Sequence, residues 1–158
     1  MTFRTKPADA GTEQNTRGEN LALAVNGGRV SSVSSNYGSP SMDSSFGANN
    51  VLDGKSSTQW SSQGEGNGAW IEIELAQDSH VTSLGFWTRT MGTSAQIASF
   101  RVITDRGEVF GPFDLADASS VHYFDVELTA KKLRFETVDS SGGNTGAVEI
   151  EVYGRPVQ

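Results

Sequence analysis

Cysteine is absent from this chain of 158 residues, which also has only two histidines and four prolines. Without cysteine there is no disulfide framework, no thiol nucleophile and no thiolate metal site. No run approaches the roughly 20 apolar residues that a membrane-spanning helix needs. The sequence also lacks a positively charged start followed by an apolar core, so we expect that it contains no signal peptide. The absence of cysteine excludes only the disulfide-stapled route to stability.

Positive charge is scarce as well, because 12 Lys and Arg stand against 19 Asp and Glu, which gives a formal net charge of −7. An acidic surface repels phosphate backbones and anionic lipid headgroups. We therefore expect neither nucleic acid as a partner nor insertion into a membrane.

The length of the chain suits one domain. Residues 1–19 hold one aromatic side chain and show no hydrophobic periodicity, which favours a linker or a disordered lead-in. We expect the folded domain to span residues 20–154 and a short tail to follow at residues 155–158.

Short apolar or alternating runs recur from residue 20 onward, which is typical of an all-β protein. Residues 70–75 and 148–153 alternate strictly between apolar and polar side chains, as strands with one buried face do. No long window has a helical period, and eight or nine strands joined by turns predict a two-sheet sandwich. The expected strands are residues 21–25, 30–34, 70–75, 81–87, 100–104, 109–113, 121–128, 133–138 and 148–153.

Four connections are longer than hairpins need, and all are rich in Gly, Ser and Asn: residues 35–49, 61–69, 88–98 and 139–147. In a sandwich such loops gather at the ends of the sheets, where binding residues are often found. Any one of them could be a solvated loop without a role. Four together favour a recognition rim.

A turn at Asp53 and Gly54 is the most informative local feature. Gly54 tolerates a positive φ, so the backbone can fold back and turn several carbonyls and one carboxylate toward a common centre. Thr58 follows five residues after Asp53 and can add its hydroxyl. Calcium takes six to eight oxygen ligands, many of them from the backbone. These residues alone leave a calcium site and a metal-free Asp-Gly turn equally open.

Several stretches of the sequence, taken together, resemble those of a known protein family. They are residues 20–23, 33–35, 48–54 with Thr58 and Trp60, 70–75, and 149–154. The combination resembles the discoidin superfamily, the C-type domain of coagulation factors five and eight, and most of all family 32 of the bacterial carbohydrate-binding modules. The resemblance implies an eight-stranded antiparallel jelly-roll β-sandwich of the galactose-binding-domain-like type, with its first and last strands as neighbours.

The resemblance also implies a structural calcium ion, and it favours this interpretation over the metal-free turn. The implied ion would tie the turn at Asp53 to the last strand. The implied ligands are the carboxylates of Asp53 and Glu149, the hydroxyl of Thr58, and the carbonyls of Asn50, Lys55, Thr58 and Val148.

A sugar site on the loop rim is a further implication. Arg89 matches the position of the family's sugar-binding arginine, and Asn144 resembles its sugar-binding asparagine. A guanidinium fork can donate to two neighbouring hydroxyls, which lysine cannot do. A solvated rim arginine is the alternative.

A sugar also needs a flat apolar face and hydrogen-bond acceptors. Tyr37 is the better candidate for the stacking face, since we expect Phe46 to serve as a core peg, and Met91 is a softer substitute. Acceptors could come from Asp43, Glu65 or Asn67, although each could equally be a solvated loop residue.

The sequence departs from the family pattern in one respect. The histidine that many sugar-binding members carry after the Trp60 position is absent, and residues 61–67 read Ser-Ser-Gln-Gly-Glu-Gly-Asn. This departure leaves room for a sugar other than plain galactose, such as an acidic or an amino sugar.

Catalysis is not expected. Glu72 and Glu74 share one face of a strand rather than facing each other across a cleft, as the two carboxylates of a glycosidase do. His80 and His122 have no serine, cysteine or metal-ligand partner at a useful spacing. No nucleophile elbow, phosphate-binding loop or zinc motif occurs.

The predicted function is therefore a non-catalytic carbohydrate-binding module with galactose-type or related sugars as ligands. We expect a bacterial protein that is secreted or on the cell surface, and that targets a tethered catalytic domain to glycans. The alternative is an adhesion domain of the discoidin type that binds protein or lipid. Lipid binding is the weaker possibility. The lipid-binding branch should show protruding apolar side chains, basic residues and a terminal disulfide, whereas this chain is acidic, has no cysteine and has small polar residues in its loops.

Overall fold

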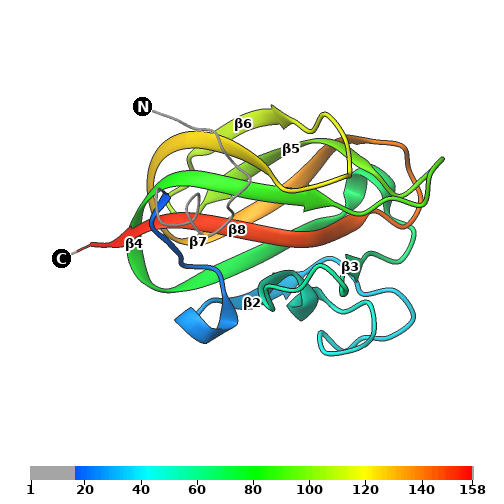
Figure 1. Ribbon diagram of the computed structural model, residues 1–158, viewed down its shortest axis with the longest axis horizontal. Helices are drawn as coiled ribbons and strands as arrows, with labels where there is room; N and C mark the ends of the chain where they lie inside the picture. Colours follow the sequence, from blue (N-terminus) through cyan, green and yellow to red (C-terminus); the bar gives the residue numbers. More distant parts are fainter. Residues whose placement is uncertain (1–16, 158) are drawn as a thin grey trace.

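The computed structural model describes residues 17–157, and within them the chain is all-β and antiparallel, as predicted (Figure 1). Most of the predicted lead-in lies outside the described residues. The helices of the described part are three short 3-10 turns, and none of them is long and apolar enough to cross a membrane. In order, the elements are β1 (Glu19–Asn20), η1 (Ala24–Asn26), β2 (Arg29–Val33), η2 (Ala48–Leu52), β3 (Trp60–Ser61), η3 (Gly66–Gly68), β4 (Trp70–Thr88), β5 (Ile97–Thr104), β6 (Val109–Asp114), β7 (His122–Ser140) and β8 (Gly146–Pro156).

Two strands of 19 residues each, β4 and β7, belong to both layers of the sandwich. The first part of β4 pairs with β2 and with the second part of β7, and its second part pairs with β8 and with the first part of β7. The register of β4 against β7 shifts between Glu74 and Ser79, where the strands bend. One continuous sheet of eight strands thus folds over on itself (Figure 1).

The sequence predicted two strands at 70–75 and 81–87, and two more at 121–128 and 133–138, where the structure has β4 and β7. Each pair is joined because strand pairing resumes immediately beyond the bend, at Ser79 opposite Ala130. The polar residues in the bend interrupt the hydrophobic pattern without ending the strand. The eight-stranded prediction is nevertheless confirmed.

The core between the two layers is centred on phenylalanines. Phe86 of β4 stacks on Phe100 of β5 with ring centroids 4.5 Å apart, and Phe135 of β7 lies 6.0 Å from Phe100. Each of the three is at most 2% exposed. Full burial of one such side chain stabilises the fold by about 1.5 to 3 kcal/mol, so this cluster holds the layers together.

The chain does not form the strand expected at residues 21–25. It turns after Asn20, whose side-chain Oδ1 accepts hydrogen bonds from the N–H groups of Ala22 and Val152 at 3.1 and 3.0 Å. β1 pairs with β8, so the first and last strands are neighbours, as the resemblance implied.

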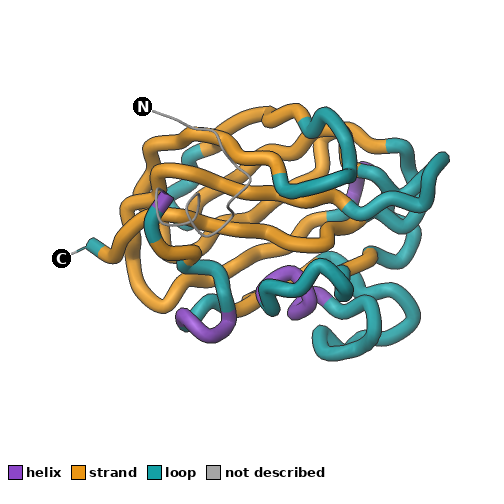
Figure 2. Tube along the Cα trace, in the orientation of Figure 1, coloured by secondary structure: helices purple, strands orange, loops and turns teal. Residues whose placement is uncertain are grey.

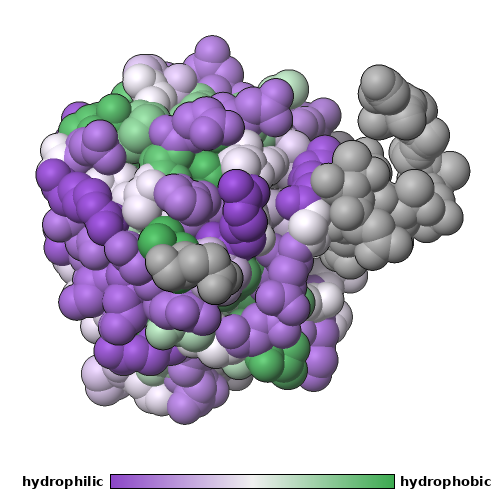
Figure 3. Space-filling view, turned by 90° about the vertical axis from the view of Figure 1, so that its left-hand side faces the viewer, coloured by the Kyte–Doolittle hydropathy of each residue, from purple (hydrophilic) through white to green (hydrophobic). Residues whose placement is uncertain are grey.

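The long loops gather at one end of the sandwich, to the right in Figure 2. Backbone hydrogen bonds tie them together: the Gly66 N–H donates to the Gly143 carbonyl, and the Ala95 N–H to the Gly142 carbonyl. The opposite end appears in Figure 3, where the visible surface is mostly hydrophilic with small scattered apolar areas. The loop end is therefore the part of the molecule where separate segments converge.

Candidate functional site

Arg89 follows β4 at the loop end, and its guanidinium is held within the protein. Its Nε donates to Oε1 of Gln59 at 2.7 Å, and its Nη1 donates to the carbonyl of Asn144 at 2.5 Å. The residue is only 8% exposed, and burial lowers the pKa of Arg89 from its usual value. An arginine nevertheless stays charged. The structure thus brings together Arg89 and Asn144, although the contact uses the backbone of Asn144.

Phe46 lies beside this arginine, and Tyr37 lies beside Phe46. The Phe46 ring centroid is 5.7 Å from Cζ of Arg89, and the Tyr37 ring meets Phe46 edge-on at 5.8 Å. Tyr37 is 42% exposed, whereas Phe46 is half-buried. The Tyr37 N–H donates to the Ser61 carbonyl at 2.8 Å and the Ser61 N–H donates to the Phe46 carbonyl at 3.0 Å, so backbone bonds fix both aromatic residues. We call Arg89, Asn144, Tyr37 and Phe46 the rim.

The predicted acceptors are engaged in bonds inside the loops. Oε1 of Glu65 accepts the Ser35 hydroxyl at 2.8 Å, and Oδ1 of Asp43 accepts the Asn49 side-chain amide at 2.6 Å. Within residues 17–157 no hydrogen bond or ion pair connects either carboxylate to Arg89. Asp43 and Glu65 are therefore not joined to the rim by direct contact.

Gln59 is a site residue that the sequence did not reveal. Its side chain accepts the Arg89 Nε–H, and its carbonyl accepts the Asn50 side-chain amide at 2.9 Å. It therefore links the turn at Asp53 to the rim. Its position next to Trp60 was the available signal. Neighbouring side chains along an extended segment point to opposite sides. Because Trp60 points into the core and is 1% exposed, Gln59 should point away from it.

The turn at Asp53 has the geometry that the sequence indicated. Gly54 has a φ of 73°. Oδ1 of Asp53 accepts the Lys55 N–H at 2.9 Å, and its Oδ2 accepts the Thr58 hydroxyl. The carboxylate thus organises the turn around itself.

Glu149, on β8, is buried next to this turn. It is 5% exposed, and neither of its carboxyl oxygens has a hydrogen-bond partner. Burial, and then the nearby Asp53 carboxylate, raise the pKa of Glu149 to about 10. Ionised, the group would be a buried charge without a partner, which is strongly unfavourable.

This chemistry fits a hard cation. Two carboxylates face each other, and no third Asp, Glu, His or Cys joins them in the described part of the chain. The remaining ligands would then be carbonyl and hydroxyl oxygens, which calcium prefers. Of the other predicted ligands, Thr58 and Lys55 contact Asp53 directly, and Val148 precedes Glu149 on β8.

The carboxylates considered for catalysis belong to the outer face of the sheet. Oε1 of Glu74 pairs with Arg29 at 2.5 Å, and Oε1 of Glu72 accepts the Ser31 hydroxyl at 2.8 Å. Surface pairs of this kind contribute little to stability. These bonds hold the two carboxylates on one face of the sheet, so they do not face each other across a cleft.

A family model described as the F5/8 type C domain matches residues 29–152. Solved structures with the same fold include a family 32 carbohydrate-binding module of Clostridium perfringens in complex with galactose, at 16% identity and a TM-score of 0.69 over 85% of this chain and 97% of that one. A second module of that organism, in complex with GalNAc-β-1,3-galactose, has the same identity and TM-score over 86% and 100%. A fucose-binding module of Streptococcus pneumoniae is 19% identical, with a TM-score of 0.62 over 87% and 96%. No curated protein sequence matches the chain.

Proposed function

The chain belongs to the F5/8 type C domain family, and from this premise we propose that it is a non-catalytic carbohydrate-binding module whose sugar site is the rim. The observation that supports this most is the placement of Arg89. Its guanidinium has five N–H donors, and Gln59 and Asn144 use two of them. Within residues 17–157 its Nη2 has no hydrogen-bond partner, which leaves donors for sugar hydroxyls, and the ring of Phe46 beside it contacts the exposed ring of Tyr37.

A sugar at the rim would use two kinds of contact. Its hydroxyls would accept from Arg89, and its C–H face would lie on the ring of Tyr37. A shallow site of this size binds weakly, with a Kd on the order of 0.1 to 1 mM, because water competes for every hydroxyl. Such modules gain strength when they are tethered to an enzyme or repeated. We therefore assign this domain a targeting role outside the cell.

A structural calcium ion belongs to the same proposal. Asp53 and Glu149 would hold it, together with oxygens of Asn50, Thr58 and the two remaining residues, Lys55 and Val148. When bound, calcium would balance the negative charges of the two carboxylates. Its role would be to tie the turn to β8, and so to keep the rim in place.

The test compares rim variants on a glycan array with calcium present, followed by calorimetric titration of the best ligand. Tyr37→Ala and Arg89→Lys should each abolish most of the binding, while Val109→Ala, a comparably exposed residue on β6, should not change it. Unchanged binding in both rim variants would place the site elsewhere. Hydrolysis of a glycoside by the domain alone would contradict a non-catalytic role.

Adhesion to lipid or protein is the competing function. In the described part of the chain, only Tyr37 and Met91 among the exposed large hydrophobic residues lie in the rim loops. Two isolated side chains are a small apolar surface. Co-sedimentation with phosphatidylserine vesicles that Tyr37→Ala abolishes would favour this second function.

A further inference from the structure

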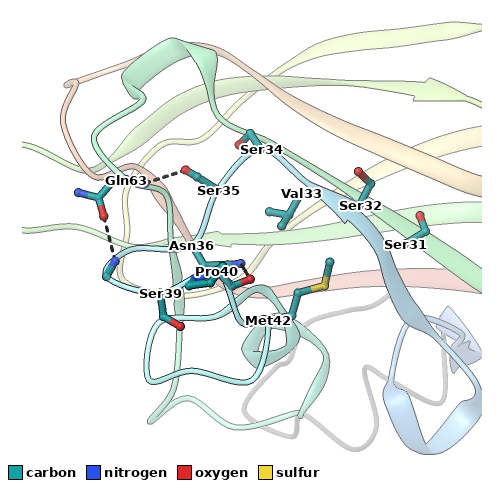
Figure 4. A pocket seen from close by; sticks show the side chains of 11 residues that line it. Ser31, Ser32, Val33, Ser34, Ser35, Asn36, Ser39, Pro40, Met42 and Gln63 are labelled. Carbon is teal, nitrogen blue, oxygen red and sulfur yellow. Dashed lines mark hydrogen bonds between the residues drawn. The ribbon is translucent and has the colours of Figure 1, made fainter.

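A groove of about 820 Å³ runs along the outer side of β2 and ends near the rim (Figure 4). One wall is the strand and the residues that follow it, 31–36, and the other is the loop up to Met42 together with Gln63. Figure 4 shows Val33 and Met42 on facing sides of this space. Its volume is within the range of small-molecule sites.

No charged residue lines the groove, although the protein is acidic. Five of its lining residues are serines, and none is Asp, Glu, Lys, Arg or His. Val33, Pro40 and Met42 add apolar surface. The lining therefore offers hydroxyls and C–H groups, and the two carboxylates that adjoin it, Glu72 and Glu65, already accept the hydroxyls of Ser31 and Ser35 at 2.8 Å.

Hydrogen bonds to neighbouring groups decide whether a serine hydroxyl is left to donate or to accept a further hydrogen bond. Ser31 donates its hydroxyl to Oε1 of Glu72 at 2.8 Å, so its oxygen is left to accept. Ser34 accepts the Trp70 N–H at 3.0 Å, so its O–H is left to donate. A mixed set of donors and acceptors suits sugar hydroxyls, because each of them can do both.

Strand β2 is an edge strand, which raises the possibility that a peptide adds to it. The Ser34 N–H bonds to the Trp70 carbonyl, and Val33 lies opposite Ile71. In an antiparallel ladder the backbone groups of Val33 then point away from β4, toward the groove. However, the register is broken between Val30 and Ser32. Such a bulge interrupts the row of backbone groups and disfavours strand addition.

The groove and the rim meet at Tyr37. Asn36 and Gly38 line the groove, and the side chain of Tyr37 between them contacts Phe46 in the rim. Gln63 holds this segment, since its Oε1 accepts the Gly38 N–H at 2.9 Å and its own N–H donates to Ser35 at 2.9 Å. A chain-like ligand could thus continue from the rim into the groove.

We propose that the groove binds the second and later residues of an uncharged oligosaccharide whose first residue occupies the rim. This inference rests on the proposed function and deepens it, because it assigns the domain to neutral glycan chains and not to single or ionic sugars. Longer neutral ligands should bind more tightly until the groove is filled.

The test titrates the domain, with calcium, against two neutral series of one to four residues, galactose and N-acetylglucosamine oligomers, and against galacturonic acid and glucosamine oligomers as charged counterparts. In the neutral series that binds, the Kd should fall roughly tenfold from the monomer to the trimer. Ser32→Glu places a charge at a half-buried groove residue that pairs with Glu72 of β4 and whose hydroxyl has no hydrogen-bond partner within residues 17–157. It should remove the gain from chain length and leave the monomer Kd unchanged. Ser120→Glu, at an exposed serine outside the groove, is the control.

The outcomes separate the two proposals. If the monomer binds in a Tyr37-dependent way but a longer chain brings no gain, or if Ser32→Glu changes nothing, the groove proposal is wrong and the rim stands. Tighter binding of a charged series than of its neutral counterpart would also overturn it. Failure of every saccharide to bind would remove the proposed function itself, and the groove proposal with it.

Discussion

Replacement of Glu149 by glutamine should stabilise the calcium-free protein at neutral pH, although most substitutions in a core destabilise. The reason is that the buried carboxyl has no hydrogen-bond partner and lies against Asp53. Glutamine has nearly the same shape but does not titrate, so it removes the cost of keeping this carboxyl protonated at neutral pH.

The magnitude follows from the pKa of this group. The pKa of Glu149 rises from its ordinary value of 4.5 to about 10 in the folded state. Above pH 4.5 the unfolded chain therefore loses a proton that the folded chain keeps. The free energy of unfolding then falls by about 1.4 kcal/mol per pH unit until the folded-state pKa is reached. Between pH 4.5 and pH 7 the loss is about 3 kcal/mol in wild type, and it is absent in Glu149→Gln.

Urea unfolding between about pH 5 and pH 8, in chelator and in calcium, measures this directly. In chelator, wild type should become steadily less stable as the pH rises, and Glu149→Gln should not. In calcium, wild type should regain stability at the upper end, because the cation binds the ionised carboxylate. Glu127→Gln, at an exposed glutamate of β7, is the control and should behave as wild type does.

Two results would refute the reasoning. One is a flat stability of wild type in chelator over this pH range, which would mean that Glu149 has an ordinary pKa. The other is a Glu149→Gln protein that is less stable than wild type at neutral pH without calcium. That outcome would mean that the carboxylate makes a favourable interaction which glutamine cannot replace.

Three further predictions concern the turn, the rim and the core. Asp53→Asn should abolish the rise in melting temperature that calcium gives to wild type, and a preserved rise would exclude Asp53 as a ligand. Gln59→Ala should raise the Kd for sugar several-fold by releasing the Nε of Arg89, with little loss of stability; calorimetry and thermal melts of one sample separate the two effects. Phe100→Ala should lower the free energy of unfolding by about 3 to 5 kcal/mol in urea titrations, and a loss below about 1 kcal/mol would contradict its central place in the core.

The strands were predictable because their signal is local. Residues 70–75 alternate between apolar and polar side chains, and the structure buries Ile71, Ile73 and Leu75 at no more than 2% exposure. The bend of β4 was not predictable in the same way. It depends on partner strands that lie far away in sequence, and polar residues such as Asp78 look like a turn in the sequence pattern.

Single residues of the candidate site could be proposed from the sequence, but their contacts could not. The pairing of Asp53 with Glu149 across 96 positions of sequence came from the resemblance, and the structure places the two side chains together. The role of Gln59 escaped because a half-buried glutamine carries no motif. We expected the guanidinium of Arg89 to be free to donate to a ligand. In the structure Arg89 is 8% exposed, and two of its N–H donors already bond to the protein.

The Gly- and Ser-rich loops resemble flexible linkers in composition, yet the structure ties them to one another. The Arg89 N–H donates to the Gly146 carbonyl, the Ser62 N–H to the Thr145 carbonyl, and the Gly66 N–H to the Gly143 carbonyl. Each bond joins two different loops, so small side chains are an advantage because they let the backbones approach. A rim that is already ordered loses little conformational entropy when a ligand binds. Under the proposed function, this order would favour ligand binding by a shallow, polar surface from which little water-exposed area is removed.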